Sequence, residues 1–337
     1  MSAVEYRRAT AAQGGLLVVS DVEGIAFGDR VRIRDHKGRK RNGQVIRAAE
    51  REALIQVFEG TDDLDLDNTW VRFLDQPLTL TVSPGLLGRV FNGIGEPRDE
   101  RPPIVDGEAR GINGSAINPA SRNYPREFIQ TGISTIDGLN SLVRGQKLPI
   151  FSGSGLPHNR LAAQIVRQAR LPGEASNFAV VFAAMGVSYT DARFFEESFS
   201  DSGVLGNVVM FINHADDPPI ERLALPRVAL TAAEYLAFDL DRHVLVVLTD
   251  MTNYSEALRE VATAKGEVPA RKGYPGYLYS DLAEIYERSG RIRDRHGSVT
   301  MVPVLSVPSD DITHPIPDLT GYSTEGQIVL SRELHNK

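Results

Sequence analysis

Residues 151–159 read Phe151-Ser152-Gly153-Ser154-Gly155-Leu156-Pro157-His158-Asn159. They follow a short apolar run at 147–151, which is typical of a buried strand. After them, residues 158–170 place their apolar side chains on one helical face, and Pro172-Gly173 would end that helix. A strand, a glycine-rich turn and a helix in this order predict a βα unit, and in open parallel sheets ligands bind at such turns.

The same alternation continues along the rest of the chain. Four later runs are interpreted as strands: 178–184, 208–212, 244–248 and 298–305. The first is apolar without alternation, which indicates a strand covered on both faces. Helical patterns lie at 191–199, 222–238, 254–265 and 281–288. We therefore expect residues 128–337 to form an α/β domain, with a mostly parallel sheet and helices on both faces.

The first 76 residues show short β-rich runs separated by turn signals. Val31 and Ile33 alternate with arginines, and Asn42-Gly43 is a typical turn. This spacing predicts a small β-barrel over residues 1–76. Residues 77–127 are rich in glycine, proline and asparagine, which predicts an extended connector that packs on the central domain.

The composition limits the function classes. The 337 residues include 37 Lys and Arg against 44 Asp and Glu, for a net charge of −7. An acidic chain is poorly suited to bind nucleic acid, whose phosphates attract basic surfaces. The lack of cysteine excludes disulfide scaffolds, thiolate zinc sites and cysteine nucleophiles. No apolar run approaches the roughly 20 residues of a membrane-spanning helix.

The glycine-rich stretch has the frame of a phosphate-binding loop, Gly-x-x-x-x-Gly-Lys-Ser/Thr, without its key groups. Ser152 takes the first glycine position and Pro157, which lacks an N–H, takes the second. His158 replaces the lysine with a shorter side chain. Asn159 replaces the hydroxyl that binds Mg²⁺. We expect a degenerate loop over residues 152–159 that holds ATP or ADP with Mg²⁺ weakly or not at all.

A second candidate is Asp250, which follows the apolar run 244–248. An acidic residue at the end of a strand fits a Walker-B position, which holds Mg²⁺. It fits a helix cap equally well, and both interpretations stand. Asp310, Asp311 and Asp318, which lie among prolines, are interpreted as loop carboxylates, and the sequence predicts neither a catalytic residue nor a metal site.

Several long strings resemble a known family far more specifically than a loop motif does. They are RVFNGIG at 89–95, FIQTGISTID at 128–137, VRGQKLPIFSGSGLP at 143–157, LTDMTNY at 248–254, GYPGY at 273–277 and HPIPDLTGY at 314–322. The chain resembles, over nearly its whole length, the non-catalytic B subunits of V-type and A-type rotary ATPases and ATP synthases.

The resemblance implies an N-terminal β-barrel followed by a RecA-like central domain. It also implies partners, namely three catalytic A subunits in an alternating hexamer, a central rotor stalk and peripheral stalk subunits. This head would stand on the cytoplasmic side of a membrane sector that carries protons or Na⁺. Contact with the membrane would come only through the complex, and no nucleic acid would be bound.

The resemblance also implies that the isolated chain is not an enzyme. Catalytic relatives carry a glutamate after a glycine at the end of the second central strand, and Val187 stands there in this chain. The family's interfacial arginine and helical C-terminal domain are expected beyond Lys337, so Arg332 is not assigned that role. A free-standing RecA-like ATPase or nucleic-acid motor is the alternative function, against which His158 and the acidic charge argue.

Overall fold

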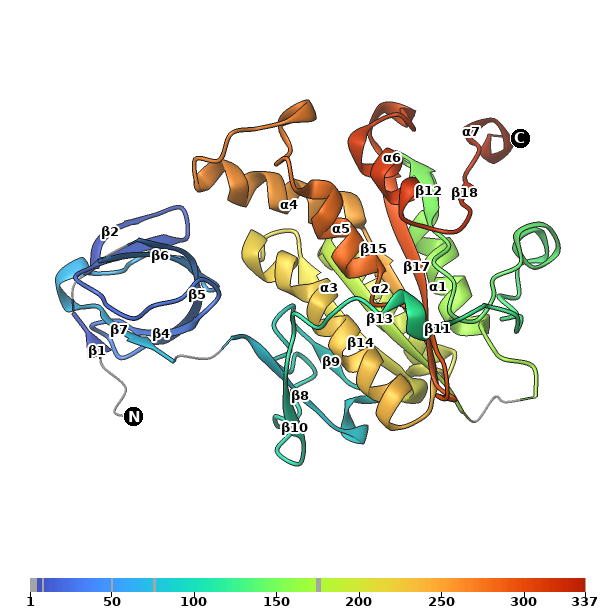
Figure 1. The fold of residues 1–337 in the computed structure, drawn as a ribbon, viewed down its shortest axis with the longest axis horizontal. Coiled ribbons are helices and arrows are strands. Elements are labelled where there is room, and N and C mark those ends of the chain that lie inside the picture. The colour runs from blue at the N-terminus through green and yellow to red at the C-terminus, as the bar shows by residue number, and fades with distance from the viewer. Residues whose placement is uncertain (1–4, 8, 50, 75–76, 174–176, 337) are drawn as a thin grey trace.

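The computed structural model describes residues 5–7, 9–49, 51–74, 77–173 and 177–336. The chain folds into two bodies, a barrel that carries the N-terminal strands and a larger domain built on one sheet. Figure 1 shows the barrel beside the larger domain, with the C-terminus on the side away from the barrel.

The barrel strands follow the order β1-β7-β4-β5-β6-β3-β2, and their pairings are antiparallel. They are β1 (Glu5–Tyr6), β2 (Ala9–Gln13), β3 (Leu16–Ser20), β4 (Arg30–Arg34), β5 (Lys40–Ala49), β6 (Glu52–Val57) and β7 (Trp70–Phe73). Val31 and Ile33 of β4 lie in the barrel core, and Arg32 between them is exposed. The β-barrel predicted from this alternation is confirmed.

The segment after the barrel is more than a connector. Its strand β8 (Thr79–Val82) pairs antiparallel with β10 (Glu108–Gly111). Another strand, β9 (Val90–Phe91), joins the edge of the main sheet, parallel to β14 (Val208–His214). The composition of residues 77–127 did not indicate this strand, because two residues are too few to show a period.

The main sheet has the order β11-β16-β17-β15-β13-β14-β9, and β12 pairs with both β17 and β18. Its other strands are β11 (Arg122–Asn123), β12 (Ile150–Gly153), β13 (Phe178–Val187), β15 (His243–Thr249), β16 (Gly290–Ile292), β17 (Ser298–Val307) and β18 (Ile328–Val329). The pairings are parallel except where β16 joins β11 and β17.

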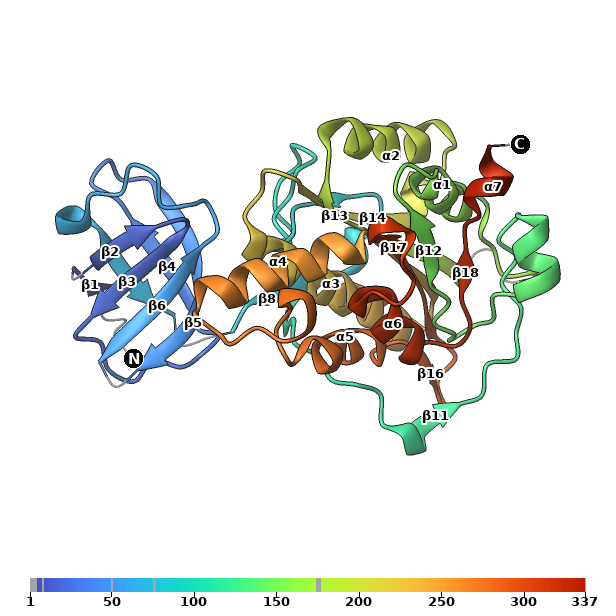
Figure 2. The same ribbon diagram turned by 90° about the horizontal axis from the view of Figure 1, so that it is seen from above.

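Helices cover both faces of this sheet. They are α1 (His158–Gln168), α2 (Tyr189–Asp201), α3 (Pro219–Glu234), α4 (Met251–Ala264), α5 (Leu278–Tyr286), α6 (Pro315–Tyr322) and α7 (Arg332–His335). Val180 and Phe182 of β13 pack in a cluster with α1 and α2, whereas Val181 and Ala183 pack in a cluster with α3 and α4. Figure 2 shows α1 and α2 on one side of the strands and α3 and α4 on the other. The predicted α/β architecture is confirmed.

The barrel contributes side chains to the core of the larger domain. The register of β5 and β6 shifts between Val45 and Arg47, so Ile46 is an extra residue in β5. Such a bulge turns a side chain to the other surface of a sheet. Ile46, Leu54 and Phe58 are buried in the same cluster as residues of α3 and α4, so the two bodies share an apolar contact.

Arg288, which follows α5, connects that segment with α3 and with the segment around Ile112 in the interior of the larger domain. Its side chain is only 1% exposed. The guanidinium donates two hydrogen bonds of 2.7 Å to the Glu234 carboxylate, one of 2.7 Å to the Ile112 carbonyl and one of 3.0 Å to the Thr231 hydroxyl. Gly114 has a φ of +55° and passes so close that a Cβ there would lie 2.4 Å from Arg288 Cζ.

We expect the Arg288→Ala variant to lose about 3 kcal/mol of unfolding free energy, since it leaves a largely buried carboxylate without its partner. Urea denaturation followed by far-UV circular dichroism measures the loss. The control is Arg193→Ala, which removes an exposed pair with Glu197 and should cost about 0.5 kcal/mol or less. Equal losses in both variants would contradict the role given to Arg288.

Candidate nucleotide-binding loop

The glycine-rich loop lies where β12 ends and α1 begins. Ser152 and Gly153 are the last residues of β12 and are buried. Ser154 and Gly155 form an exposed turn. Gly155 has a φ of +81°, a left-handed conformation that glycine adopts without strain. The loop therefore stands at the carboxyl end of a parallel strand, as predicted.

The second half of the loop uses its amides internally. Leu156 is buried, and its N–H donates to the Gly153 carbonyl at 3.1 Å. Pro157 is the residue before α1, and His158 and Asn159 are the first two residues of that helix. The His158 N–H donates to the Leu156 carbonyl at 2.9 Å. A phosphate loop instead aims such N–H groups at the anion.

The His158 ring is turned back toward the loop. Its Nδ1 lies 3.2 Å from the Ser152 hydroxyl oxygen and 3.1 Å from the Leu156 carbonyl oxygen. A lysine in this position would extend a charged amine toward a phosphate. His158 instead hydrogen-bonds with groups of the loop itself.

An ion pair from two later segments lies against the loop. Arg332 Nε and Nη2 donate to the two Asp310 carboxylate oxygens at 2.8 and 2.9 Å. Arg332 Nη2 also donates to the Ser154 carbonyl at 2.8 Å. A Cβ built on Gly153 would collide with the Asp310 carboxylate and lie 2.8 Å from Arg332 Nη2. The hydrogen bond from Arg332 holds the pKa of the Asp310 carboxyl below its usual range.

The backbone holds both partners of this pair in place. β18 pairs parallel with β12, and the Leu330 N–H donates to the Phe151 carbonyl at 2.9 Å. This pairing brings Arg332, two residues later, over the loop. On the other side, Ser309 and Asp310 both have a φ of +56°, a left-handed conformation that costs a residue with a Cβ energy.

Asp250 lies at the same edge of the sheet as the loop, with β17 between their strands. It is 6% exposed and caps α4, because its Oδ1 accepts from the Thr252 N–H at 2.8 Å. Both carboxylate oxygens also accept from the Ser306 N–H of β17, at 3.0 and 3.1 Å. The carboxylate thus acts as a helix cap, while its role toward a nucleotide stays a prediction.

Val187, which the resemblance places at the position of a catalytic glutamate, is the last residue of β13. Its side chain packs in the apolar cluster of α1 and α2, and its carbonyl accepts from the Ala215 N–H at 2.9 Å. An aliphatic side chain cannot orient or deprotonate a water molecule, so this position offers no general base.

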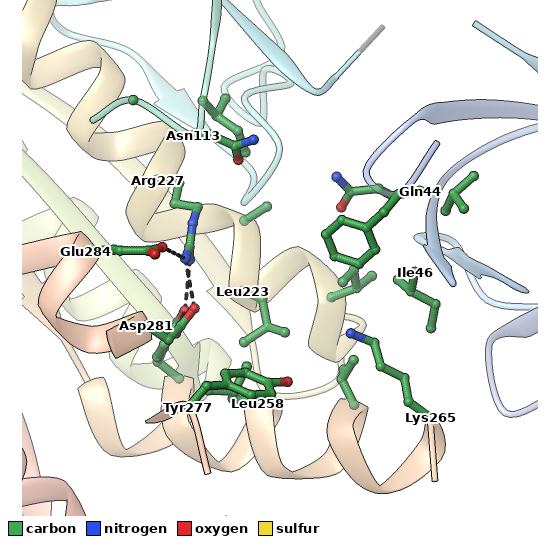
Figure 3. Close-up of a pocket in the computed structure, with 18 of the residues that line it drawn as sticks. Gln44, Ile46, Asn113, Leu223, Arg227, Leu258, Lys265, Tyr277, Asp281 and Glu284 are labelled. Atoms are coloured by element: carbon green, nitrogen blue, oxygen red, sulfur yellow. Dashed lines mark hydrogen bonds and ion pairs between the residues drawn. The ribbon is translucent and has the colours of Figure 1, made fainter. Parts of the chain in front are cut away.

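A cleft of about 780 Å³ opens elsewhere, between the barrel and the larger domain. Figure 3 shows Gln44 and Ile46 of the barrel facing Leu223 and Leu258 of the helices across it. Its most prominent cation, Arg227, is already paired with Asp281 at 2.8 Å, and Glu284 lies 3.7 Å away. The cleft is lined by apolar and polar side chains together, and its strong charges pair with one another.

Metal binding and membrane insertion have no candidate in the part of the chain that the structure describes. Within those residues, no group of three or more His, Asp or Glu side chains is arranged to hold a metal ion. None of the described helices combines the length and the apolar character needed to cross a bilayer.

Sequence reasoning located the loop but missed the pair that covers it. Asp310 has the pattern of an ordinary loop carboxylate, and Arg332 lies in a polar segment 22 residues later. They meet because β18 pairs with β12, and a two-residue strand leaves no recognisable pattern. The signal in the sequence is weak: a short apolar run, Ile328-Val329-Leu330, precedes Arg332 and resembles a short strand.

Comparison with known proteins agrees with this geometry. Residues 132–337 match the ATP synthase alpha/beta family, nucleotide-binding domain, and residues 10–75 match the beta-barrel domain of the same family. A solved structure described as a unique ATP synthase subunit, NeqB from Nanoarcheaum equitans, is 42% identical, with a TM-score of 0.72. The similarity covers 96% of this chain and 74% of that one.

Two curated relatives are closer in sequence. A V-type ATP synthase beta chain from Nitrosococcus oceani is 71% identical over 337 residues, which are all of this chain and 70% of the relative. The B subunit of an A-type ATP synthase from Aeropyrum pernix is 58% identical over 333 residues, or 99% of this chain and 72% of the relative. The resemblance seen in the sequence motifs is confirmed, and the chain belongs to the ATP synthase alpha/beta family.

Proposed function

We propose that this chain is a non-catalytic B subunit in the soluble head of a rotary ATP synthase or ATPase. It would alternate with three catalytic A subunits in a hexamer whose ATP turnover is coupled to proton or Na⁺ transport. The observation that supports this most strongly is the 71% identity to a V-type ATP synthase beta chain along the entire chain.

The residues of the loop and of the end of β13 support the proposal that the subunit is non-catalytic. Phosphoryl transfer in such domains requires a loop lysine, a hydroxyl on Mg²⁺ and a residue that orients the attacking water. His158, Asn159 and Val187 stand at these positions. The Asp310 carboxylate, which lies against Gly153, adds negative charge where a phosphate would approach. The chemistry of ATP would then take place in the partner subunit.

The place of the chain in the complex is proposed on the same basis. Its partners would be the A subunits, the central rotor stalk and the peripheral stalk, on the cytoplasmic side of the membrane sector. It would touch the membrane only through these partners. We propose domain limits of 1–76 for the barrel, 77–127 for the connecting segment and 128–337 for the central domain.

We expect the purified chain to hydrolyse no ATP above background in the presence of Mg²⁺, because the three groups that transfer needs are absent. Phosphate release in a coupled assay measures this. The control is the His158→Ala variant, which separates the activity of this chain from that of a contaminant. Robust Mg²⁺-dependent hydrolysis that the control variant loses would contradict the proposal.

We expect the chain to assemble with a catalytic A subunit, such as the one that accompanies the Nitrosococcus oceani relative. Native mass spectrometry of the co-expressed proteins should show equal numbers of the two subunits in one particle. The full-length Nitrosococcus oceani beta chain serves as the matched control. Assembly of that control with the A subunit, while this chain stays separate, would argue against the proposed partnership.

A further inference from the structure

We propose that Asp310 and Arg332 close the glycine-rich loop, so that Asp310 excludes phosphate groups and Arg332 is held away from them. The inference rests on the proposed function, because it gives a cause for weak nucleotide binding beyond the missing lysine. It predicts that removing the charge of Asp310 frees Arg332 to bind a polyphosphate anion.

The Asp310 carboxylate is positioned to block the loop. It occupies the space directly in front of Gly153, where even a methyl group would collide with it. Gly153 is the last residue of β12, and a phosphate loop at that point needs open space and free N–H groups. The carboxylate fills this space and competes with an incoming anion for the Arg332 guanidinium.

The charge of Arg332 is compensated at the loop. The Arg332 guanidinium lies against Gly153 and Ser154 of the loop. Its Nε and Nη2 are both engaged by Asp310, and Nη2 also donates to the Ser154 carbonyl. A bidentate arginine–carboxylate pair has a fixed geometry, so the cation is neutralised as long as Asp310 is ionised.

The backbone keeps both partners at the loop. β18 is fixed to β12 by the Ile328 and Leu330 N–H groups, which donate to the Pro149 and Phe151 carbonyls at 2.9 Å. Asp310 sits in a left-handed backbone conformation that an L-residue adopts at a cost. Closing of the loop is thus supported by backbone hydrogen bonds as well as by the ion pair.

The test measures binding of inorganic pyrophosphate to the full chain and to Asp310→Asn, by calorimetry in a buffer without phosphate. Asparagine keeps the size of the side chain and tolerates the left-handed conformation. We expect Asp310→Asn to bind about two- to fivefold more tightly than the unsubstituted chain, the upper part of the range for one exposed charge pair. Asp310→Gly, which suits the same conformation, is the second variant if the first does not fold.

Two controls separate this cause from a general change in charge. Asp311→Asn removes the neighbouring carboxylate, which bonds Thr313 and Lys272 instead of the loop, and should leave binding unchanged. The double variant Asp310→Asn with Arg332→Gln should lose the gain, because the freed cation is gone.

The outcomes distinguish the inference from the function on which it rests. Equal, weak binding by the unsubstituted chain and Asp310→Asn would overturn the inference and leave the degenerate loop intact. A gain that persists in the double variant, or that Asp311→Asn reproduces, would overturn it as well. Tight binding by the unsubstituted chain would overturn the degenerate loop itself, and the closing pair with it.

Discussion

The packing of β13, β15 and β17 between two layers of helices is the constraint on which the rest of the structure depends. Side chains of these strands are buried on both faces, which fixes their register and brings their carboxyl ends to one edge. β17 lies between β12, which leads into the loop, and β15, which leads to Asp250. The two strands are therefore two strand spacings apart, about 10 Å. The Asp250 carboxylate accepts a hydrogen bond from the Ser306 N–H of β17, which links the end of β15 to β17 at this edge.

This edge carries the glycine-rich loop and Asp250, and the polar groups there satisfy one another. The Asp250 carboxylate accepts hydrogen bonds from backbone N–H groups, and the His158 ring hydrogen-bonds within the loop. The Asp310 carboxylate is paired with Arg332. The fold is held by apolar burial and does not require a ligand.

Much of the fold could be predicted because its signals are local. The apolar run 178–184 and the helical face of 158–170 each contain enough residues to show a period or its absence. The β9 and β18 strands could not be predicted, since their pairing depends on tertiary contacts of two residues each. For the same reason the loop was located from the sequence, whereas the meeting of Asp310 and Arg332 was not. Asp250 fitted two roles, and only the position of Thr252 and Ser306 showed that it caps α4.

The bulge at Ile46 ties the barrel to the central core, and the distribution of aromatic side chains makes this tie observable. Trp70, the single tryptophan of the chain, lies in β7 of the barrel, whereas the long helices lie in the central domain. Tryptophan fluorescence, excited at a wavelength that tyrosine does not absorb, therefore reports on the barrel, and helical ellipticity reports on the central domain. Coincidence of the two signals during unfolding would show that the contact made by Ile46, Leu54 and Phe58 couples the two bodies into one cooperative unit.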